Sequence, residues 1–494
     1  MTPSDASALN LNPLSPAEQA NVSPAEIFQA ELNGSKLTRP MWMLWILSAG
    51  LIALDGFDFF IIGVAMPFIQ KDFGLSAGWV GAIATAALAG ALVGSLTLGP
   101  VTDKVGRQLM LMIDIGLFVV ASLGTALAWN AWSLLFFRFA VGIGIGADYP
   151  ISVSYITENT PANVRGRMVI GAFSFQSVGA LLGALVGWAT ILAFQQIAPE
   201  LAVNYAWRCM LGVGIVLSVL VGGLRLLFLL ESPSYYIAKG NYEEASKSAS
   251  KLLEKPIHLE PVEVSAEVST ELTASKESAK LGYADLFSPA YLKQTALASI
   301  PWFLQDIATY GIGIFTPTII ATLAFADSDG LLMREMASAR GAAIVNVFLV
   351  IGFLFAVLLV DRVGRIRLQI IGFVGMAAGL GILALSGSSL ALLFTGFILF
   401  NLMMNFGPNS TTFLLSGELF PPEIRASGAG LAGGIAKSGA VLGALLLPIL
   451  QERIGVEGVV RSLAIICLFA AIITYSLRTA AQPNEHSISN TSRA

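Results

Sequence analysis

Long apolar stretches recur along nearly the whole chain, and they limit its fold more than any other feature. Each is long enough to cross the hydrocarbon core of a bilayer, which takes about 20 helical residues. They lie at residues 42–69, 78–100, 108–129, 131–156, 168–194 and 207–230, and again at 292–323, 341–361, 367–387, 389–416, 427–450 and 459–478. Only 12% of the residues are charged, against about a quarter in soluble proteins. The sequence therefore predicts an all-α polytopic membrane protein with twelve transmembrane helices.

Polar segments outside these stretches predict the domain boundaries. Residues 1–40 are rich in Ser, Pro, Asn and Ala and predict a disordered tail. We expect a six-helix bundle over 41–230, a polar central loop over 231–290 that is partly helical at 242–253, a second bundle over 291–480 and a short tail over 481–494. Lys and Arg are more frequent in the short loops on the side of the termini, which predicts that both termini and the central loop are cytoplasmic.

Charged residues at corresponding helix ends recur in both halves of the chain. An Asp and an Arg lie four residues apart in DKVGR and again in DRVGR, and a Glu and an Arg lie seven residues apart further along each half. These residues are Asp103, Arg107, Glu158 and Arg165 in the first half and Asp361, Arg365, Glu418 and Arg425 in the second. The recurrence predicts two pseudo-symmetric six-helix halves with a substrate site where they meet. We expect ion pairs among these residues to hold one face closed, as gates and not as ligands.

Several of these motifs resemble a large superfamily of transporters. GPVTDKVGRQ is similar to the loop motif of the major facilitator superfamily, RFAVGIGIG to the fourth helix of its sugar porters, and ESPSYYIAKG to the segment after their sixth helix. The second copy of the loop motif departs from the family at Val357, where the family has glycine. The resemblance covers the whole membrane core and implies the major facilitator fold.

Four further stretches resemble the phosphate:proton symporter family of that superfamily. They are GADYPIS, WFLQDIATY, NFGPNSTTF and GIAKSGA, which fall on four predicted helices in the family's order, with Ala147 in place of a family glycine. The resemblance implies a substrate site lined by Tyr149, Trp302, Asp306, Tyr310, Asn409 and Lys437. Gln176 is a further neutral donor that suits a phosphate ion. The expected partners of the chain are thus a small-molecule substrate, protons and the lipid bilayer.

The chemistry of two of these stretches can be read from the residues themselves. Trp302, Asp306 and Tyr310 are spaced four residues apart, so they form one stripe along a helix and can present an indole, a carboxyl and a phenol to one cavity. An aromatic packing stripe is the alternative. Lys437 lies in an otherwise apolar helix, where an ammonium group needs a negative partner. That partner is either a phosphate ion or, in a purely structural role, Asp306.

Carboxylates are the candidates for proton coupling, because both histidines lie in polar stretches outside the apolar runs. Asp55 and Asp58 share a helix face, and such a pair favours a raised pKa at one member. We expect Asp55 to pair with Arg138, as the resemblance to sugar porters implies, and Asp58 either to titrate or to be a capping or packing carboxylate. Asp148 is a second candidate proton site.

The predicted function is proton-coupled uptake of inorganic phosphate by alternating access. The sequence leaves three alternatives. The first is transport of a small organic acid or sugar, in which Lys437 would bind a carboxylate. The second is a membrane receptor, which the short central loop disfavours. The third is an enzyme, which lacks a nucleophile and base pair in the apolar stretches. We expect no cofactor or metal, no nucleic-acid partner, a monomer, and a location in the cell (inner) membrane.

Overall fold

The computed structural model of the chain describes residues 23–105, 107–228, 230–260, 283–324, 330–387, 389–421 and 424–481. Side chains are described for these residues except 99–105, 107, 108, 111, 147–151, 153, 154, 425 and 426. Regular structure in this part of the chain is helical, and no strand occurs among these residues.

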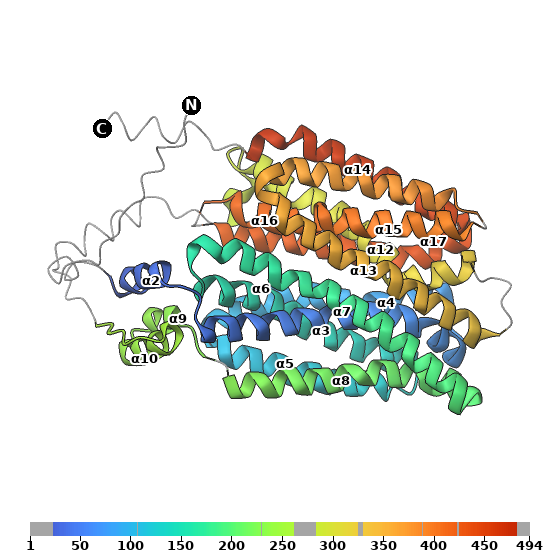
Figure 1. The fold of residues 1–494 in the computed structure, drawn as a ribbon, viewed down its shortest axis with the longest axis horizontal. Helices are drawn as coiled ribbons and strands as arrows, with labels where there is room; N and C mark the ends of the chain where they lie inside the picture. Colours follow the sequence, from blue (N-terminus) through green and yellow to red (C-terminus); the bar gives the residue numbers. More distant parts are fainter. Residues whose placement is uncertain are drawn as a thin grey trace.

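Each half of the chain contributes a bundle of long helices. The N-terminal half contains α3 (Arg39–Phe73), α4 (Ala77–Val105), α5 (Arg107–Ala126), α6 (Ala131–Glu158), α7 (Ala162–Ile197) and α8 (Ala202–Phe228). The C-terminal half contains α12 (Leu292–Ala324), α13 (Leu331–Val363), α14 (Arg365–Ala384), α15 (Leu390–Phe406), α16 (Pro408–Glu418) and α17 (Arg425–Ser476). In Figure 1 the C-terminal half lies along the N-terminal half, with their helices roughly aligned.

The number of membrane crossings agrees with the twelve that the sequence predicts. Nine helical segments in the described part of the chain are long and apolar enough to cross a membrane, and α5 and α6 contain shorter apolar helices. α15 and α16 form one crossing interrupted at Gly407, whereas α17 forms two because Gly455 has a non-helical backbone with φ 72°. Positive φ at this bend is a conformation that glycine adopts without steric cost.

Glycines on α6 let neighbouring helices approach closely. A Cβ atom built on Gly142 would lie 2.0 Å from the Ala87 carbonyl oxygen of α4, and one on Gly146 would lie 2.1 Å from that of Ala91. Real Cβ atoms do not approach so closely, so both positions depend on the missing side chain. This packing of backbone on backbone is typical of membrane helices.

A small unit of short helices covers one end of the bundle. It comprises α2 (Pro24–Gly34), α9 (Pro233–Ala238) and α10 (Tyr242–Leu253), and we call this end of the bundle the α10 end. It lies at the left of Figure 1. α10 confirms the helix predicted over these residues.

The expectation of a disordered tail is wrong for residues 24–34, because α2 is folded and packed. Phe28 and Leu32 on one face of α2 are fully buried in an apolar cluster that includes Ala249 and Leu252 of α10. The backbone N–H of Ala162, at the start of α7, donates a 3.0 Å hydrogen bond to Asn33. Burial of this apolar face stabilises a helix that would be marginal alone in water.

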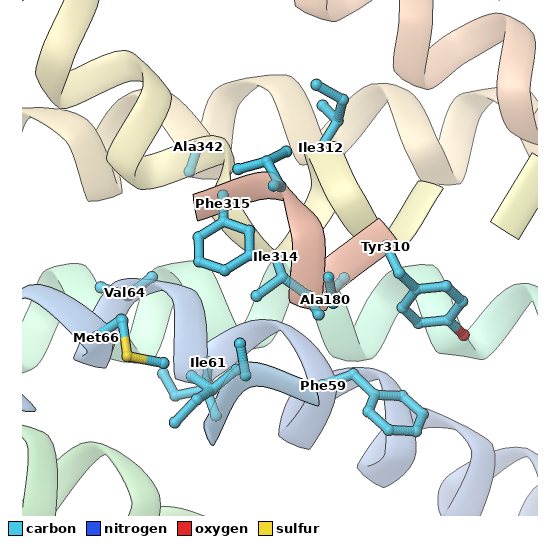
Figure 2. Close-up of a cluster of buried hydrophobic side chains, with 14 of the residues drawn as sticks. Phe59, Ile61, Val64, Met66, Ala180, Tyr310, Ile312, Ile314, Phe315 and Ala342 are labelled. Atoms are coloured by element: carbon cyan, nitrogen blue, oxygen red, sulfur yellow. The ribbon is translucent and has the colours of Figure 1, made fainter. Parts of the chain in front are cut away.

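The main core runs along the contact between the halves. Figure 2 shows part of it, with side chains from α3, α7, α12 and α13 packed together and Tyr310 and Phe59 at one edge. The two rings meet edge to face, with centroids 5.7 Å apart. Tyr310 thus joins the apolar core to the polar site described next.

Candidate functional site

Lys437 of α17 contacts two side chains of α12. Its Nζ atom donates a hydrogen bond to the Tyr310 hydroxyl at 3.0 Å and lies 3.7 Å from Asp306 Oδ2. The Lys437 side chain is 13% exposed and that of Asp306 is 2% exposed, so this charged pair is almost fully removed from solvent. The pairing that the sequence leaves open as the structural alternative is therefore present, beside a cavity.

The stripe predicted on α12 is present, and its three members lie on one side of the helix. The Trp302 side chain lies near the Asp306 carboxylate. Trp302, Asp306 and Tyr310 are all buried, on the side of α12 that meets α17. The ammonium group of Lys437 compensates the buried Asp306 charge, although Asp306 Oδ2 accepts no hydrogen bond within the described part of the chain.

Gln176 brings the N-terminal half into the same group. Its Nε2 atom on α7 donates to the Tyr310 hydroxyl at 3.3 Å. Because the hydroxyl oxygen accepts from both Gln176 and Lys437, its own hydrogen remains available to donate to a ligand. The contact places residues from both halves around one phenol.

A chain of buried amides continues from this site across the bundle. Gln305 Nε2 donates to Asn409 Oδ1 at 3.2 Å, and Asn409 Nδ2 donates to Asn405 Oδ1 at 2.7 Å. Asn405 Nδ2 then donates to Ser177 Oγ at 2.9 Å. This series of hydrogen bonds runs through α12, α16 and α15 and ends on α7, so it too crosses between the halves.

A small cavity lies between these two groups. Its volume is about 20 Å³, which is room for about one water molecule. Both halves line it, and its walls are formed by Phe60, Gln176, Ser177, Ala180, Thr309, Tyr310, Leu349, Met404, Asn405 and Asn409. A solute larger than water fits only if this space widens, and movement of the halves relative to one another would widen it.

The expected pairing of Arg138 is wrong in its partner. Arg138 Nη1 lies 2.8 Å from both carboxylate oxygens of Asp58, and the Arg138 side chain is fully buried. Asp55 is also buried, and its charge acts on Lys437. Among the described residues, Asp58 is therefore the carboxylate that pairs with the buried arginine.

Three of the residues expected to form ion pairs do so at the α10 end, and Arg167 joins them. Arg365 contacts Asp361 at 3.4 Å and Glu418 at 3.1 Å, which joins three helices of the C-terminal half. Arg167 of α7 lies 3.8 Å from Asp361 and so connects the two halves. Arg165 donates to the Thr160 carbonyl at 3.3 Å. Asp103, Arg107, Asp148, Tyr149 and Arg425 also belong to the predicted site and gates, but their side chains are outside the described part of the structure.

Aromatic rings lie between the cavity and the α10 end. Phe413 of α16 stacks on Phe173 of α7 at a centroid distance of 4.7 Å. The edge of the Trp302 ring meets Phe413, also at 4.7 Å. The stacked pair joins the halves with apolar surface, in addition to the exposed pair of Arg167 and Asp361.

Two helical halves around a buried polar cavity are typical of transporters, and the family model assigns this chain to a transporter class and not to an enzyme class. The chain belongs to the sugar (and other) transporter family, whose family model matches residues 43–481. It has the twelve-helix fold seen in solved structures of the major facilitator superfamily.

Individual relatives differ in what they carry. A probable inorganic phosphate transporter 1-12 of Oryza sativa is 28% identical, covering 84% of this chain and 83% of the relative. The 4-hydroxybenzoate transporter PcaK of Acinetobacter baylyi is also 28% identical, covering 91% and 94%. Among solved structures, the xylose transporter XylE from E. coli has a TM-score of 0.69 at 19% identity, covering 89% of this chain and 98% of XylE. XylE supports the fold alone.

Sequence reasoning missed the inner part of the polar wall. Gln305, Asn405 and Ser177 are buried and bonded to one another through Asn409, yet none was predicted to belong to the site. A signal was available, since each is a polar residue next to or one helical turn from a predicted site residue. Amides in apolar helices face partners or cavities because lipid offers them no hydrogen bonds.

Proposed function

We propose that this protein is a proton-coupled symporter of inorganic phosphate that works by alternating access. The observation that carries the proposal is the position of Lys437, a buried ammonium group bonded to Tyr310, which lines the cavity and has a hydroxyl hydrogen left to donate. A phosphate ion supplies negative charge and several acceptor oxygens to such a group of donors. The plant phosphate transporters among the relatives support the same substrate.

Proton coupling is assigned to the buried carboxylates. Asp58 is paired with Arg138 between α3 and α6, so protonation of Asp58 would weaken a contact between these helices. Asp306 and Asp55 lie near Lys437, so their protonation would change the charge that the anion meets. We place the α10 end in the cytoplasm of a cell membrane, in accord with the distribution of basic residues.

Transport of an organic acid is the second candidate, and the cavity wall is the specific observation that favours it. Phe60, Leu349 and Met404 give part of the lining an apolar character that phosphate does not use. PcaK, a relative of nearly the same length, carries an aromatic acid. In this case Lys437 would bind the carboxylate and the apolar wall would contact the rest of the molecule.

Uptake by proteoliposomes tests both candidates in one experiment. The purified protein would be reconstituted with an imposed proton gradient and supplied with labelled phosphate, in competition with arsenate, sulfate, glucose, 4-hydroxybenzoate and succinate. Saturable uptake that arsenate alone inhibits supports the phosphate proposal. Absence of phosphate uptake, with gradient-driven uptake of a labelled carboxylic acid, overturns it in favour of the second candidate.

A further inference from the structure

Ser177 differs from the other hydroxyl residues of its helix. Ser174 donates to the Gly171 carbonyl at 2.6 Å and Thr190 donates to the Val186 carbonyl at 2.8 Å, so both hydroxyls are satisfied within α7. Ser177 accepts from Asn405 at 2.9 Å, and within the described part of the chain its hydroxyl donates no hydrogen bond. Serines in membrane helices commonly bond back to the preceding turn, so this departure needs a cause.

Asn405 is held in one orientation by its neighbours. Its carbonyl oxygen accepts from Asn409 at 2.7 Å, while its Nδ2 group donates both to Ser177 and to the Leu349 carbonyl at 3.0 Å. An amide has two donor hydrogens, and both are used. The amide therefore presents a donor to Ser177 Oγ, which turns the serine hydrogen away from Asn405.

The cavity is where that hydrogen can find an acceptor. Ser177 lines the cavity and is 5% exposed, so bulk water is not its partner. Tyr310, on the cavity wall contributed by the C-terminal half, likewise has a hydroxyl hydrogen left over after accepting twice. The two hydroxyls are donors from opposite halves that line the same small space.

We propose that Ser177 is a further substrate-binding residue, which donates to an oxygen of a tetrahedral oxyanion, and that Asn405 is the positioning residue that orients it. The inference rests on the proposed function and extends it. A tetrahedral anion has oxygens on all sides and can accept from Lys437 and Tyr310 on one half and from Ser177 on the other. A carboxylate bound at Lys437 has its two oxygens on one side only, so it would gain less from Ser177.

Substitution at Ser177 separates this role from a structural one. In the Ser177→Ala protein we expect the Kd and KM for inorganic phosphate to rise about tenfold, because a hydrogen bond to a charged group is lost. Turnover at saturation should change less. Competition by arsenate should weaken with that of phosphate, whereas competition by monocarboxylates should not. Ser174→Ala is the matched control, since its hydroxyl is satisfied within the helix, and it should bind phosphate like the wild type.

A double-mutant cycle tests the part assigned to Asn405. If Asn405 acts through Ser177, the protein with both Asn405→Ala and Ser177→Ala should bind phosphate no more weakly than Asn405→Ala alone. Thermal unfolding measured on the same proteins reports any loss of folding separately. If the losses of phosphate affinity in the two single variants multiply in the double variant, the positioning role of Asn405 is overturned.

The remaining outcomes also discriminate. Saturable phosphate binding by the wild type, with Ser177→Ala binding within about twofold of it, would overturn this inference and leave the proposed function standing. A wild-type protein that binds no phosphate would remove both. Weakened phosphate binding confined to the Ser177 and Asn405 variants supports the proposal.

Discussion

Arg138 and Asp58 form a buried ion pair between α6 and α3, with Arg138 Nη1 2.8 Å from each carboxylate oxygen. Arg138 Nη2 also donates to the Asp58 backbone carbonyl at 3.3 Å. Removal of one charge of such a pair is strongly destabilising, because the other charge is left buried and uncompensated. Protonation of Asp58 would therefore change the stability of the contact between α3 and α6.

Asp58→Asn fixes the neutral form at this position with little change in shape. We expect the variant to lose gradient-driven accumulation, so that internal substrate rises only to the level seen without a gradient. Substrate binding and counterflow exchange should persist, because neither needs net proton movement. Comparison of uptake with and without a proton gradient in proteoliposomes measures the difference.

Asp72→Asn serves as the control for that prediction. Asp72 also lies beside an arginine, 3.8 Å from Arg208, but at the end of α3 away from the cavity. Accumulation by this variant should match the wild type. Concentrative uptake by Asp58→Asn at the wild-type rate would exclude Asp58 from coupling and leave Asp55 or Asp148 as the candidates.

Lys437→Met tests whether the lysine binds substrate or only neutralises Asp306. We expect anion binding to fall at least about tenfold, because the charged donor is lost and a buried carboxylate remains. Equilibrium binding of labelled phosphate is the measurement, with the exposed Lys71→Met as control.

The combined variant with Lys437→Met and Asp306→Asn makes the distinction sharper. Removing both charges relieves the uncompensated carboxylate, so thermal stability should recover relative to Lys437→Met alone. Anion binding should not recover. Binding that returns together with stability would mean that Lys437 is a structural partner of Asp306.

Much of this architecture could be predicted from hydropathy and spacing. The crossings follow from apolar runs, and the stripe of Trp302, Asp306 and Tyr310 follows from the helical period, so neither depends on how helices pack. The partner of Arg138 does depend on packing. Asp55 and Asp58 share one helix face, and only the register between α3 and α6 decides which of them meets the arginine. Side-chain spacing within one helix carries no information on that register.

The helix α2 was missed for another reason. Ser23 and Glu26 form a capping box, with Pro24 at the first helical position, and this pattern is a recognised helix start. The prediction of a disordered tail followed from a composition rich in Ser, Pro and Asn and did not take this local helix signal into account. The helix is stabilised by distant contacts with α10 and α7, which a reading of residues 1–40 alone does not contain.

Phe413→Ala should favour the state that is open at the α10 end. The stacked pair of Phe413 and Phe173 joins the halves there, and loss of such a ring contact costs about 1 kcal/mol, a roughly fivefold shift between states. The exposed pair of Arg167 and Asp361 contributes no more than about 1 kcal/mol and is screened by salt. The effect of Phe413→Ala should therefore persist at high salt, whereas that of Arg167→Ala should vanish.

Distances between spin labels at the α10 ends of α7 and α16 measure this shift. Cys209 and Cys467 are the only cysteines of the chain and are both free, so a background with each changed to serine allows specific labelling. Leu414→Ala is a suitable control, since this neighbour of Phe413 packs in a cluster within the C-terminal half. An unchanged distance distribution in Phe413→Ala at all salt concentrations would mean that the aromatic pair does not stabilise the state closed at the α10 end.

Phe28→Ala should release α2 from the α10 end without unfolding the bundle. Phe28 is fully buried between α2 and α10, and truncation of a buried Phe costs about 3–5 kcal/mol, more than an 11-residue helix can lose and stay docked. Hydrogen exchange should then become fast in residues 24–34 and faster in α10, with α3 to α8 unchanged. Gln29→Ala, at the partly exposed neighbouring position, should leave exchange as in the wild type. Slow exchange retained in Phe28→Ala would mean that the hydrogen bond of Asn33 to Ala162 and the ion pair of Glu31 with Lys255 suffice to hold α2 in place.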